Sequence, residues 1–307
     1  MTKVLIGVDG SDRSEDAVTF GRAFALAAGA PVILSMAYQP EPPQPRLDEH
    51  LPHQGLREEA ESILARFALM LLDVADVERR ALADHSPARA LQAAAEQAGA
   101  GIIVVGSSHV SRLGRVLPGS TAERLLHGAP CPVAVVPVGF GTRGLPQHPV
   151  IGCGYDATDD GAAALGAAEE LAFALGGSLQ VTYIVAPPSY LYDSGEMPLN
   201  MPELDARMRA EAERVLTERV GHLSSRLRNV EGTVQVGRPA EQLISWTEAV
   251  DVMVVGSRGY GPLKAVLLGG VSGQLIRLAA CPVIVVPRGA HTSVGSLFGP
   301  SAVVDSL

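Results

Sequence analysis

The sequence has few cysteines, few aromatic residues and no excess of basic charge, and each shortage excludes a class of protein. Cys131, Cys153 and Cys281 form no C-x-x-C pair, which argues against a zinc or dithiol site and fits small buried side chains in a reducing compartment. Aromatic residues make up 4% of the chain, so we expect an aliphatic core. The net charge of −9 argues against a nucleic-acid partner, which requires a basic face.

Long hydrophobic runs are also missing. No run of 18 apolar residues occurs, so no membrane-spanning helix is predicted. The N-terminus opens directly into the apolar run 3–9, rather than into the charged region and hydrophobic core of a signal peptide. These features predict a cytoplasmic protein with no membrane partner.

What the chain does contain is a long internal repeat. Val104-Val105-Gly106-Ser107 returns as Val254-Val255-Gly256-Ser257, an offset of 150 (256 minus 106), and Asp9 returns as Asp156, an offset of 147 (156 minus 9). Solenoid repeats are only about 20–50 residues long, so this repeat predicts a duplicated domain. The predicted domains are residues 1–138 and 149–290, with a linker at 139–148 and a tail at 291–307.

Each copy alternates apolar strand patterns with helical patterns, which is typical of a parallel sheet. Strands are expected at 3–9, 31–37, 76–83, 101–106 and 132–137, and at 149–155, 178–185, 231–236, 251–256 and 282–287. Right-handed crossovers then favour the strand order 3-2-1-4-5. The predicted fold class is α/β, with two repeated doubly wound domains, each a five-stranded parallel sheet with helices on both faces.

In this strand order a ligand crevice is expected at the switch point, outside the carboxyl ends of the first and fourth strands. Asp9 and Gly106 follow these strands in the first copy, and Asp156 and Gly256 follow them in the second. The most unusual residues of each copy are therefore expected in one crevice.

A glycine-rich loop in the second copy indicates what this crevice binds. It reads Gly256-Ser257-Arg258-Gly259, then nine residues, then Gly269-Gly270-Val271-Ser272. Glycines let backbone N–H groups approach an anion, and the second glycine pair opens a helix whose N-terminus favours negative charge. The loop predicts a phosphate site, to which Ser272 can add a hydroxyl. Arg258 either neutralises phosphate charge or lies solvated at the surface.

This spacing, G-x-x-G followed after nine residues by G and usually Ser or Thr, resembles that of the universal stress protein family. The likeness covers nearly the whole chain twice and includes Val8-Asp9-Gly10-Ser11, Tyr155-Asp156-Ala157-Thr158 and the Cys-Pro-Val entry to the last strand of each copy. It implies an α/β fold that binds ATP or a related adenine nucleotide, with Mg²⁺ possible beside ATP. It also implies that the aspartates Asp9 and Asp156 hold the adenosine, and that Ala37 and Ile184 lie against the base.

The predicted nucleotide-binding residues therefore fall in both copies. They are Asp156, Ala157, Ile184, Gly256, Arg258, Gly259, Gly269, Gly270, Val271 and Ser272 in the second copy, and Asp9, Gly10, Ala37, Gly106, Gly119, Ser120 and Thr121 in the first. No catalytic residue and no metal ligand is predicted. The first copy has His109 where the second glycine is expected, whereas the second copy has Gly270 where Ser or Thr is usual. We favour the second copy as the better nucleotide site, and the first is either weaker or specialised for interface contacts.

Two further patterns have simple structural interpretations. Ser11, Ser14 and Thr158 stand near helix starts and are interpreted as N-caps. Gly139–Gly144 matches G-x-G-x-x-G by letter, but prolines follow at once, so it is interpreted as linker rather than as a dinucleotide-binding helix start.

Three functions remain open from the sequence. The leading hypothesis is a nucleotide-dependent stress-response regulator with an unknown signalling partner. An enzyme would be at most a slow ATPase. Phosphoryl transfer needs a metal ligand and a residue to orient the nucleophile, and the sequence shows no clear general base apart from Asp9 and Asp156, which are assigned to the nucleoside. The third hypothesis is a ligand-free interaction module. A duplicated chain is expected to form an internal pseudo-dimer through edge contacts around 132–137 and 282–287. Because exposed edges favour pairing, a further homodimer is an expectation as well.

Overall fold

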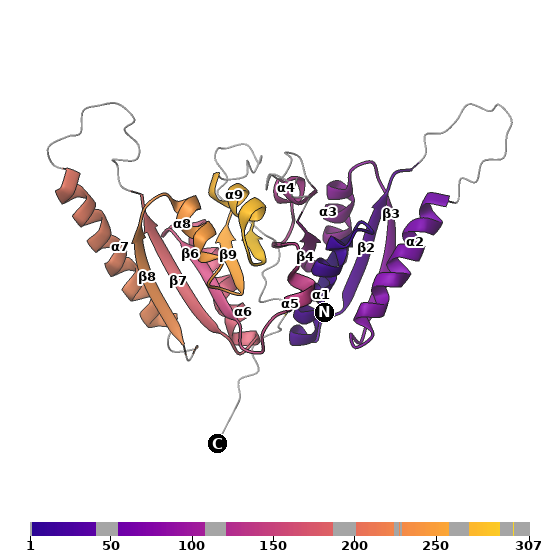
Figure 1. The fold of residues 1–307 in the computed structure, drawn as a ribbon, viewed down its shortest axis with the longest axis horizontal. Helices are drawn as coiled ribbons and strands as arrows, with labels where there is room; N and C mark the ends of the chain where they lie inside the picture. The colour runs from indigo at the N-terminus through magenta and orange to yellow at the C-terminus, as the bar shows by residue number, and fades with distance from the viewer. Residues whose placement is uncertain are drawn as a thin grey trace, which may run out of the picture. The chain divides into compact units, whose positions relative to one another are not determined.

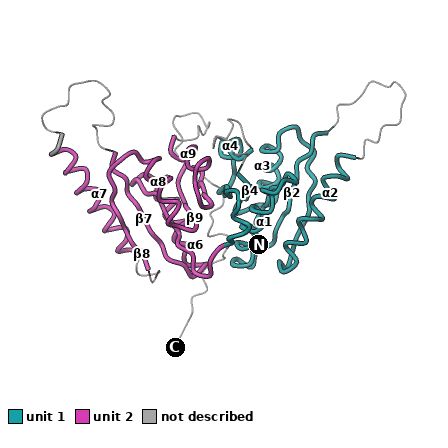
Figure 2. Tube along the Cα trace, in the orientation of Figure 1, with its two compact units in different colours: residues 1–144, 290–307 teal, residues 145–289 magenta. Residues whose placement is uncertain are grey.

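A computed structural model describes residues 2–40, 55–107, 121–186, 201–223, 227, 229–257, 270–288 and 297 of the chain. The chain divides into two compact units (Figure 2). Unit 1 consists of residues 1–144 with 290–307, and unit 2 consists of residues 145–289. None of the helices in the described ranges is long and apolar enough to cross a membrane.

Unit 1 alternates strands and helices along the chain (Figure 1). Its elements are β1 (Lys3–Val8), α1 (Arg13–Ala28), β2 (Val32–Tyr38), α2 (Gly55–Ala68), the 3-10 helix η1 (Leu69–Leu71), β3 (Val77–Ala83), α3 (Pro87–Ala98), β4 (Ala100–Gly106), α4 (Thr121–Leu126), β5 (Val133–Val136) and α5 (Phe140–Arg143). Its strands are parallel, in the order β3-β2-β1-β4-β5.

Unit 2 repeats this order of elements. They are β6 (Val150–Tyr155), α6 (Asp159–Ala174), β7 (Ser178–Val185), α7 (Met201–Leu223), β8 (Val230–Val236), α8 (Pro239–Trp246), β9 (Val252–Gly256), α9 (Gly270–Leu278) and β10 (Val283–Val286). The parallel strands follow the order β8-β7-β6-β9-β10. In both units the predicted order 3-2-1-4-5 is confirmed.

Helices cover both faces of each sheet, as glycines at close contacts show. Gly21 of α1 lies against Ile6 of β1, whereas the next residue of that strand, Gly7, lies against Leu91 of α3. Successive strand residues point to opposite faces, so α1 and α3 cover opposite faces of the sheet. In unit 2, Gly154 of β6 lies against Leu243 of α8 in the same way as Gly7 lies against Leu91. The doubly wound architecture follows from this arrangement.

The core of each unit is aliphatic. The central strands are almost wholly buried, and all three cysteines are buried without disulfides. Burial raises the pKa of the Cys131 thiol to about 12. The interpretation of the cysteines as small buried side chains is confirmed.

Local signals set most helix ends. Pro87 and Pro239 occupy the first turns of α3 and α8. Proline is tolerated there because the backbone N–H groups of a first turn have no intrahelical acceptor in any case. Gly29 ends α1 in the left-handed conformation with φ 56°, which a glycine adopts without steric cost. Helix α2 ends at Ala68, and the chain continues directly into the 3-10 helix η1.

Two interpretations of local sequence were incomplete. The predicted linker contains α5, because the buried Asp16 carboxylate of α1 accepts hydrogen bonds from the N–H groups of Gly139 (3.1 Å) and Gly141 (2.6 Å). Thr158 is the N-cap of α6, where its hydroxyl accepts from the N–H of Gly161 at 3.1 Å. The N-cap of α1, however, is Asp12, which makes no side-chain cap.

One residue of the C-terminal segment belongs to the core of unit 1. Leu297 is 5% exposed, and its side chain lies against Gly101 near the start of β4, beside Thr2. A methyl group on Gly101 would be 2.7 Å from Cγ of Leu297, so glycine is needed there for the leucine to fit. The first unit is thus completed by a residue that follows the whole of the second.

Candidate functional site

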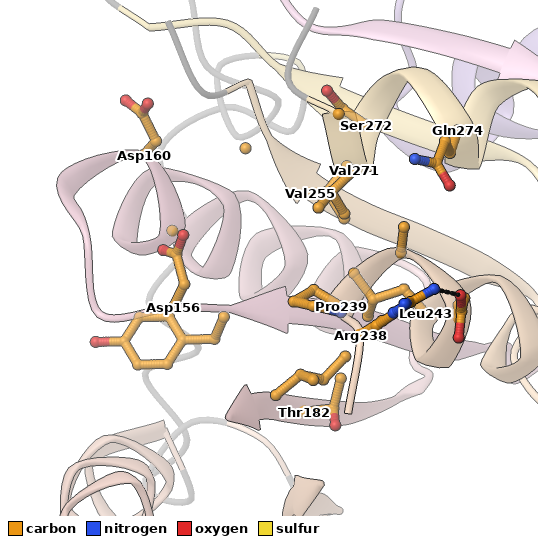
Figure 3. Close-up of a pocket in the computed structure, with 18 residues that line it drawn as sticks. Asp156, Asp160, Thr182, Arg238, Pro239, Leu243, Val255, Val271, Ser272 and Gln274 are labelled. Carbon is orange, nitrogen blue, oxygen red and sulfur yellow. Dashed lines mark hydrogen bonds and ion pairs between the residues drawn. The ribbon is translucent and has the colours of Figure 1, made fainter. Parts of the chain in front are cut away.

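The carboxyl ends of β6 and β9 in unit 2 border a pocket of about 570 Å³, which lies within the range of small-molecule sites. It is lined by six of the predicted residues, Asp156, Ile184, Gly256, Gly270, Val271 and Ser272. These residues come from the turn after β6, from β7, from the end of β9 and from the start of α9 (Figure 3). The pocket therefore lies at the switch point, where the strand order predicts a ligand site.

The turn after β6 positions Asp156 at one side of this pocket. Oδ1 of Asp156 accepts hydrogen bonds from the backbone N–H (3.2 Å) and the hydroxyl (2.6 Å) of Thr158. Between them, Ala157 has φ 57°, a left-handed conformation that costs a residue with a Cβ roughly 1–2 kcal/mol. Ala157 itself does not line the pocket. Its backbone lets the chain reverse into α6 while the carboxylate stays at the crevice.

The opposite side of the pocket is the start of α9. Gly270 is its first residue, followed by Val271 and the buried Ser272. Apart from its chain neighbours and the backbone of its own helix, no atom of the described residues lies within 4 Å of the position that a methyl group on Gly270 would occupy. The first N–H groups of a helix have no intrahelical acceptor and carry partial positive charge. This side of the crevice therefore suits an anion.

The remaining wall is largely apolar and comes from residues that the sequence analysis did not single out. Leu243 of α8 and Val255 of β9 line the pocket together with Ile184, and Thr182 lines it from β7. Arg238, which precedes α8, also lines it, and its Nη1 donates to Oε1 of Glu241 at 3.1 Å (Figure 3). An apolar wall with a few polar groups is typical of a site for an aromatic or heterocyclic ligand.

A second carboxylate also lines the pocket. Asp160, in the first turn of α6, is 6% exposed, and its Oδ1 accepts from Nε of Arg288 at 3.0 Å. This hydrogen bond raises the pKa of Arg288. The backbone of Asp160 lies so close to Gly256 that a methyl group there would be 2.6 Å from the Asp160 carbonyl oxygen. The first glycine of the loop is thus required for the fold as well as available to a ligand.

The equivalent turn of unit 1 is built differently. Oδ1 of Asp9 accepts from the N–H and the hydroxyl of Ser11 and from the hydroxyl of Ser14. Burial raises the pKa of Asp9, but these hydrogen bonds outweigh it, and the pKa lies below its ordinary value of 3.8. Ser11 and Ser14 therefore bind the aspartate, so their interpretation as N-caps was wrong. In unit 2 Gly161 stands where Ser14 stands in unit 1, and a methyl group on it would overlap Oδ1 of Asp156.

Helix α2 also covers this turn in unit 1. Gly10 has φ 83°, and a methyl group on it would be 3.0 Å from Cδ1 of Ile63. Nη2 of Arg66 donates to the Gly10 carbonyl oxygen at 2.9 Å. Among the other predicted residues of this copy, Ala37 lies near the end of β2, Gly106 ends β4 and Thr121 opens α4. Gly106 contacts the Arg13 carbonyl as Gly256 contacts that of Asp160.

Five predicted residues lie outside the described ranges. They are Arg258, Gly259 and Gly269 in unit 2 and Gly119 and Ser120 in unit 1. In unit 2, Gly256 and Gly270, which lie on either side of the undescribed range, line the same pocket. Among the residues that it does describe, no three His, Cys, Asp or Glu side chains meet as a metal site.

Fold and crevice together define a class of protein, a tandem doubly wound α/β chain with a ligand-sized pocket at a switch point. Comparison with known sequences identifies the family within this class. The sequence pattern of the Universal stress protein family matches residues 1–137 and 149–287, and the chain belongs to this family.

Mycobacterial universal stress proteins are among its relatives. The chain is 30% identical over 291 residues to the universal stress protein Rv2623 of Mycobacterium tuberculosis, covering 92% of this chain and 95% of the relative. It is 28% identical over 294 residues to Rv2005c of the same organism, with 92% and 96% covered. A crystal structure of a universal stress protein from Archaeoglobus fulgidus superposes with a TM-score of 0.68, at 21% identity and with 94% and 98% covered. That likeness shows the shared fold.

Proposed function

We propose that unit 2 binds an adenine nucleotide, ATP or a relative of it, and that its occupancy changes the contacts of this universal stress protein with a partner. The observation that carries the proposal is the pocket itself, which places Asp156 opposite the helix start at Gly270. A carboxylate can accept hydrogen bonds from ribose hydroxyls, and a helix N-terminus can hold phosphate oxygens. The apolar wall of Ile184, Leu243 and Val255 offers a surface for the base.

The differences between the two turns favour unit 2 over unit 1. In unit 1 both Ser11 and Ser14 donate to Oδ1 of Asp9, whereas in unit 2 Gly161 replaces the second serine. Ile63 and Arg66 of α2 also contact the Gly10 turn of unit 1. A ligand at Asp9 would compete with these contacts, so we expect unit 2 to bind more tightly.

A charge placed at the start of α9 tests the site. Gly270→Asp adds a carboxylate where a methyl group would meet no other element of the described structure, so the variant is expected to fold and to repel phosphate. Its control is Gly221→Asp in α7 of the same unit, which likewise has open space. Isothermal titration calorimetry with ATP and AMP should show binding to the wild type and the control. Gly270→Asp should bind at least about tenfold more weakly, the loss of one charge-assisted contact.

The same preparations separate the alternative functions. A wild-type protein that is purified without nucleotide and ignores millimolar ATP and AMP would refute the proposal and favour a ligand-free interaction module. Steady-state hydrolysis that is abolished in Asp156→Asn would instead favour a slow ATPase. Size-exclusion chromatography with and without ATP tests the remaining part of the proposal, that occupancy alters association, with a homodimer as the first partner to be examined.

A further inference from the structure

Asp160 has an unsatisfied carboxylate oxygen. Its side chain is 6% exposed, and Oδ1 is paired with Nε of Arg288. Oδ2 is buried and has no hydrogen-bond partner among the residues that the structure describes. A buried carboxylate oxygen without a partner is costly, and such groups in native proteins often mark a site where an ion or water belongs.

The position of Asp160 indicates which ion belongs there. The residue lines the same pocket as Asp156 and Ser272 (Figure 3), and its backbone contacts Gly256. A nucleotide whose phosphates lie at the start of α9 would bring further negative charge into this pocket. Like charges in a partly desolvated site repel strongly. A divalent cation between the carboxylate and the phosphates would turn this repulsion into attraction.

We infer that Oδ2 of Asp160 is a ligand of a divalent cation, Mg²⁺ or Mn²⁺, that enters with the phosphates of the nucleotide. This inference rests on the proposed nucleotide function. Mg²⁺ is usually held by one or two carboxylates together with substrate phosphates and several waters, so one carboxylate is enough. Because the phosphates supply part of the coordination, the site is complete only with the nucleotide present, and we expect the cation to bind together with it.

The inference predicts a reversal that a purely structural role would not produce. Without a divalent cation, Asp160→Asn removes repulsion, so the variant should bind ATP more tightly than the wild type does. With Mg²⁺ the variant lacks a ligand and should bind more weakly than the wild type. Asp159→Asn is the matched control, because the neighbouring aspartate lies in the same helical turn but is exposed. Asp159→Asn and Asp160→Asn change the net charge of the protein by the same amount.

Calorimetric titration of ATP into the full-length wild type, Asp160→Asn and Asp159→Asn, each in EDTA and in Mg²⁺, decides the matter. Mg²⁺ should strengthen ATP binding about tenfold or more in the wild type and the control, and about threefold or less in Asp160→Asn. Thermal unfolding midpoints establish that all three proteins are folded. If the wild type binds no nucleotide in either buffer, the proposed function itself fails. If ATP binds but Asp160→Asn shows the same Mg²⁺ effect as the wild type, or binds more tightly in both buffers, only the cation site is refuted.

Discussion

The contact between Gly256 and Asp160 makes a sharp prediction about stability. Gly256→Ala would put a methyl group 2.6 Å from the Asp160 carbonyl oxygen and 2.9 Å from its carbonyl carbon. Both are backbone atoms of the first turn of α6, so no side-chain rotation relieves the overlap. Overpacking of this kind costs about 1–3 kcal/mol, and we expect unit 2 to lose that much free energy of unfolding.

The control is another glycine of the same unit. Gly166 lies in the middle of α6, and among the described residues a methyl group on it would meet no atom within 4 Å beyond its chain neighbours and the backbone of its own helix. Gly166→Ala should therefore stabilise unit 2 by about 0.5–1 kcal/mol, because alanine loses less backbone entropy on helix formation. The same chemical change should thus have opposite signs at two positions.

Trp246 provides the assay. It is the only tryptophan of the chain and lies in α8, so urea unfolding followed by tryptophan fluorescence reports on unit 2. The unfolding free energies of the two variants should differ by about 1.5–4 kcal/mol, the sum of the two estimates. If Gly256→Ala proves as stable as Gly166→Ala, the close contact between α6 and the end of β9 is refuted, and with it the proposed position of Asp160 beside the phosphates.

Three further outcomes are expected. Thr158→Ala should lower the free energy of unfolding of unit 2 by about 0.5–2 kcal/mol because the N-cap is lost. Asp12→Ala should change the free energy of unfolding little because Asp12 makes no side-chain cap. Urea unfolding of the two variants tests both expectations. Because the pKa of Asp9 is lowered in the folded protein, its carboxylate contributes stability above about pH 4, and this stability is lost as the pH falls through the folded-state pKa. Asp9→Asn should therefore lose less stability than the wild type between about pH 7 and pH 3, as followed by circular dichroism. Burial raises the pKa of the Cys131 and Cys153 thiols, so mass spectrometry should find iodoacetamide labelling at pH 8 only after unfolding; rapid labelling of the native protein would contradict this.

The strand order and the place of the crevice were predictable because both depend on local patterns. Apolar runs of strand length fixed the elements, and the right-handed crossover rule fixed their order. The residues that follow the first and fourth strands, such as Asp156 and Gly256, then had to meet at one end of the sheet. Six predicted residues line the pocket for this reason.

The contacts that the sequence analysis missed are long-range. An aspartate in a first helical turn is common because it suits the helix dipole, so nothing local marked Asp160 as buried beside Gly256. Arg238 comes from the turn after β8, two strands away from β6. Helix α5 forms because Asp16, more than a hundred residues earlier in the chain, accepts its N–H groups. A signal for Arg238 was present, since Pro239 marked a helix start at the carboxyl end of a neighbouring strand.

The burial of Leu297 on Gly101 has a consequence for how the protein is made and divided. Because residues 290–307 group with unit 1, the first unit is discontinuous in sequence. A ribosome therefore completes unit 2 before it supplies Leu297 to the core of unit 1. A fragment that ends at residue 144 would leave Gly101 without its leucine, whereas residues 145–289 form an uninterrupted unit. Unit 2 is therefore the unit to express alone. Limited proteolysis that removes the C-terminal segment should lower the stability of unit 1, although most of that unit lies at the N-terminal end of the chain.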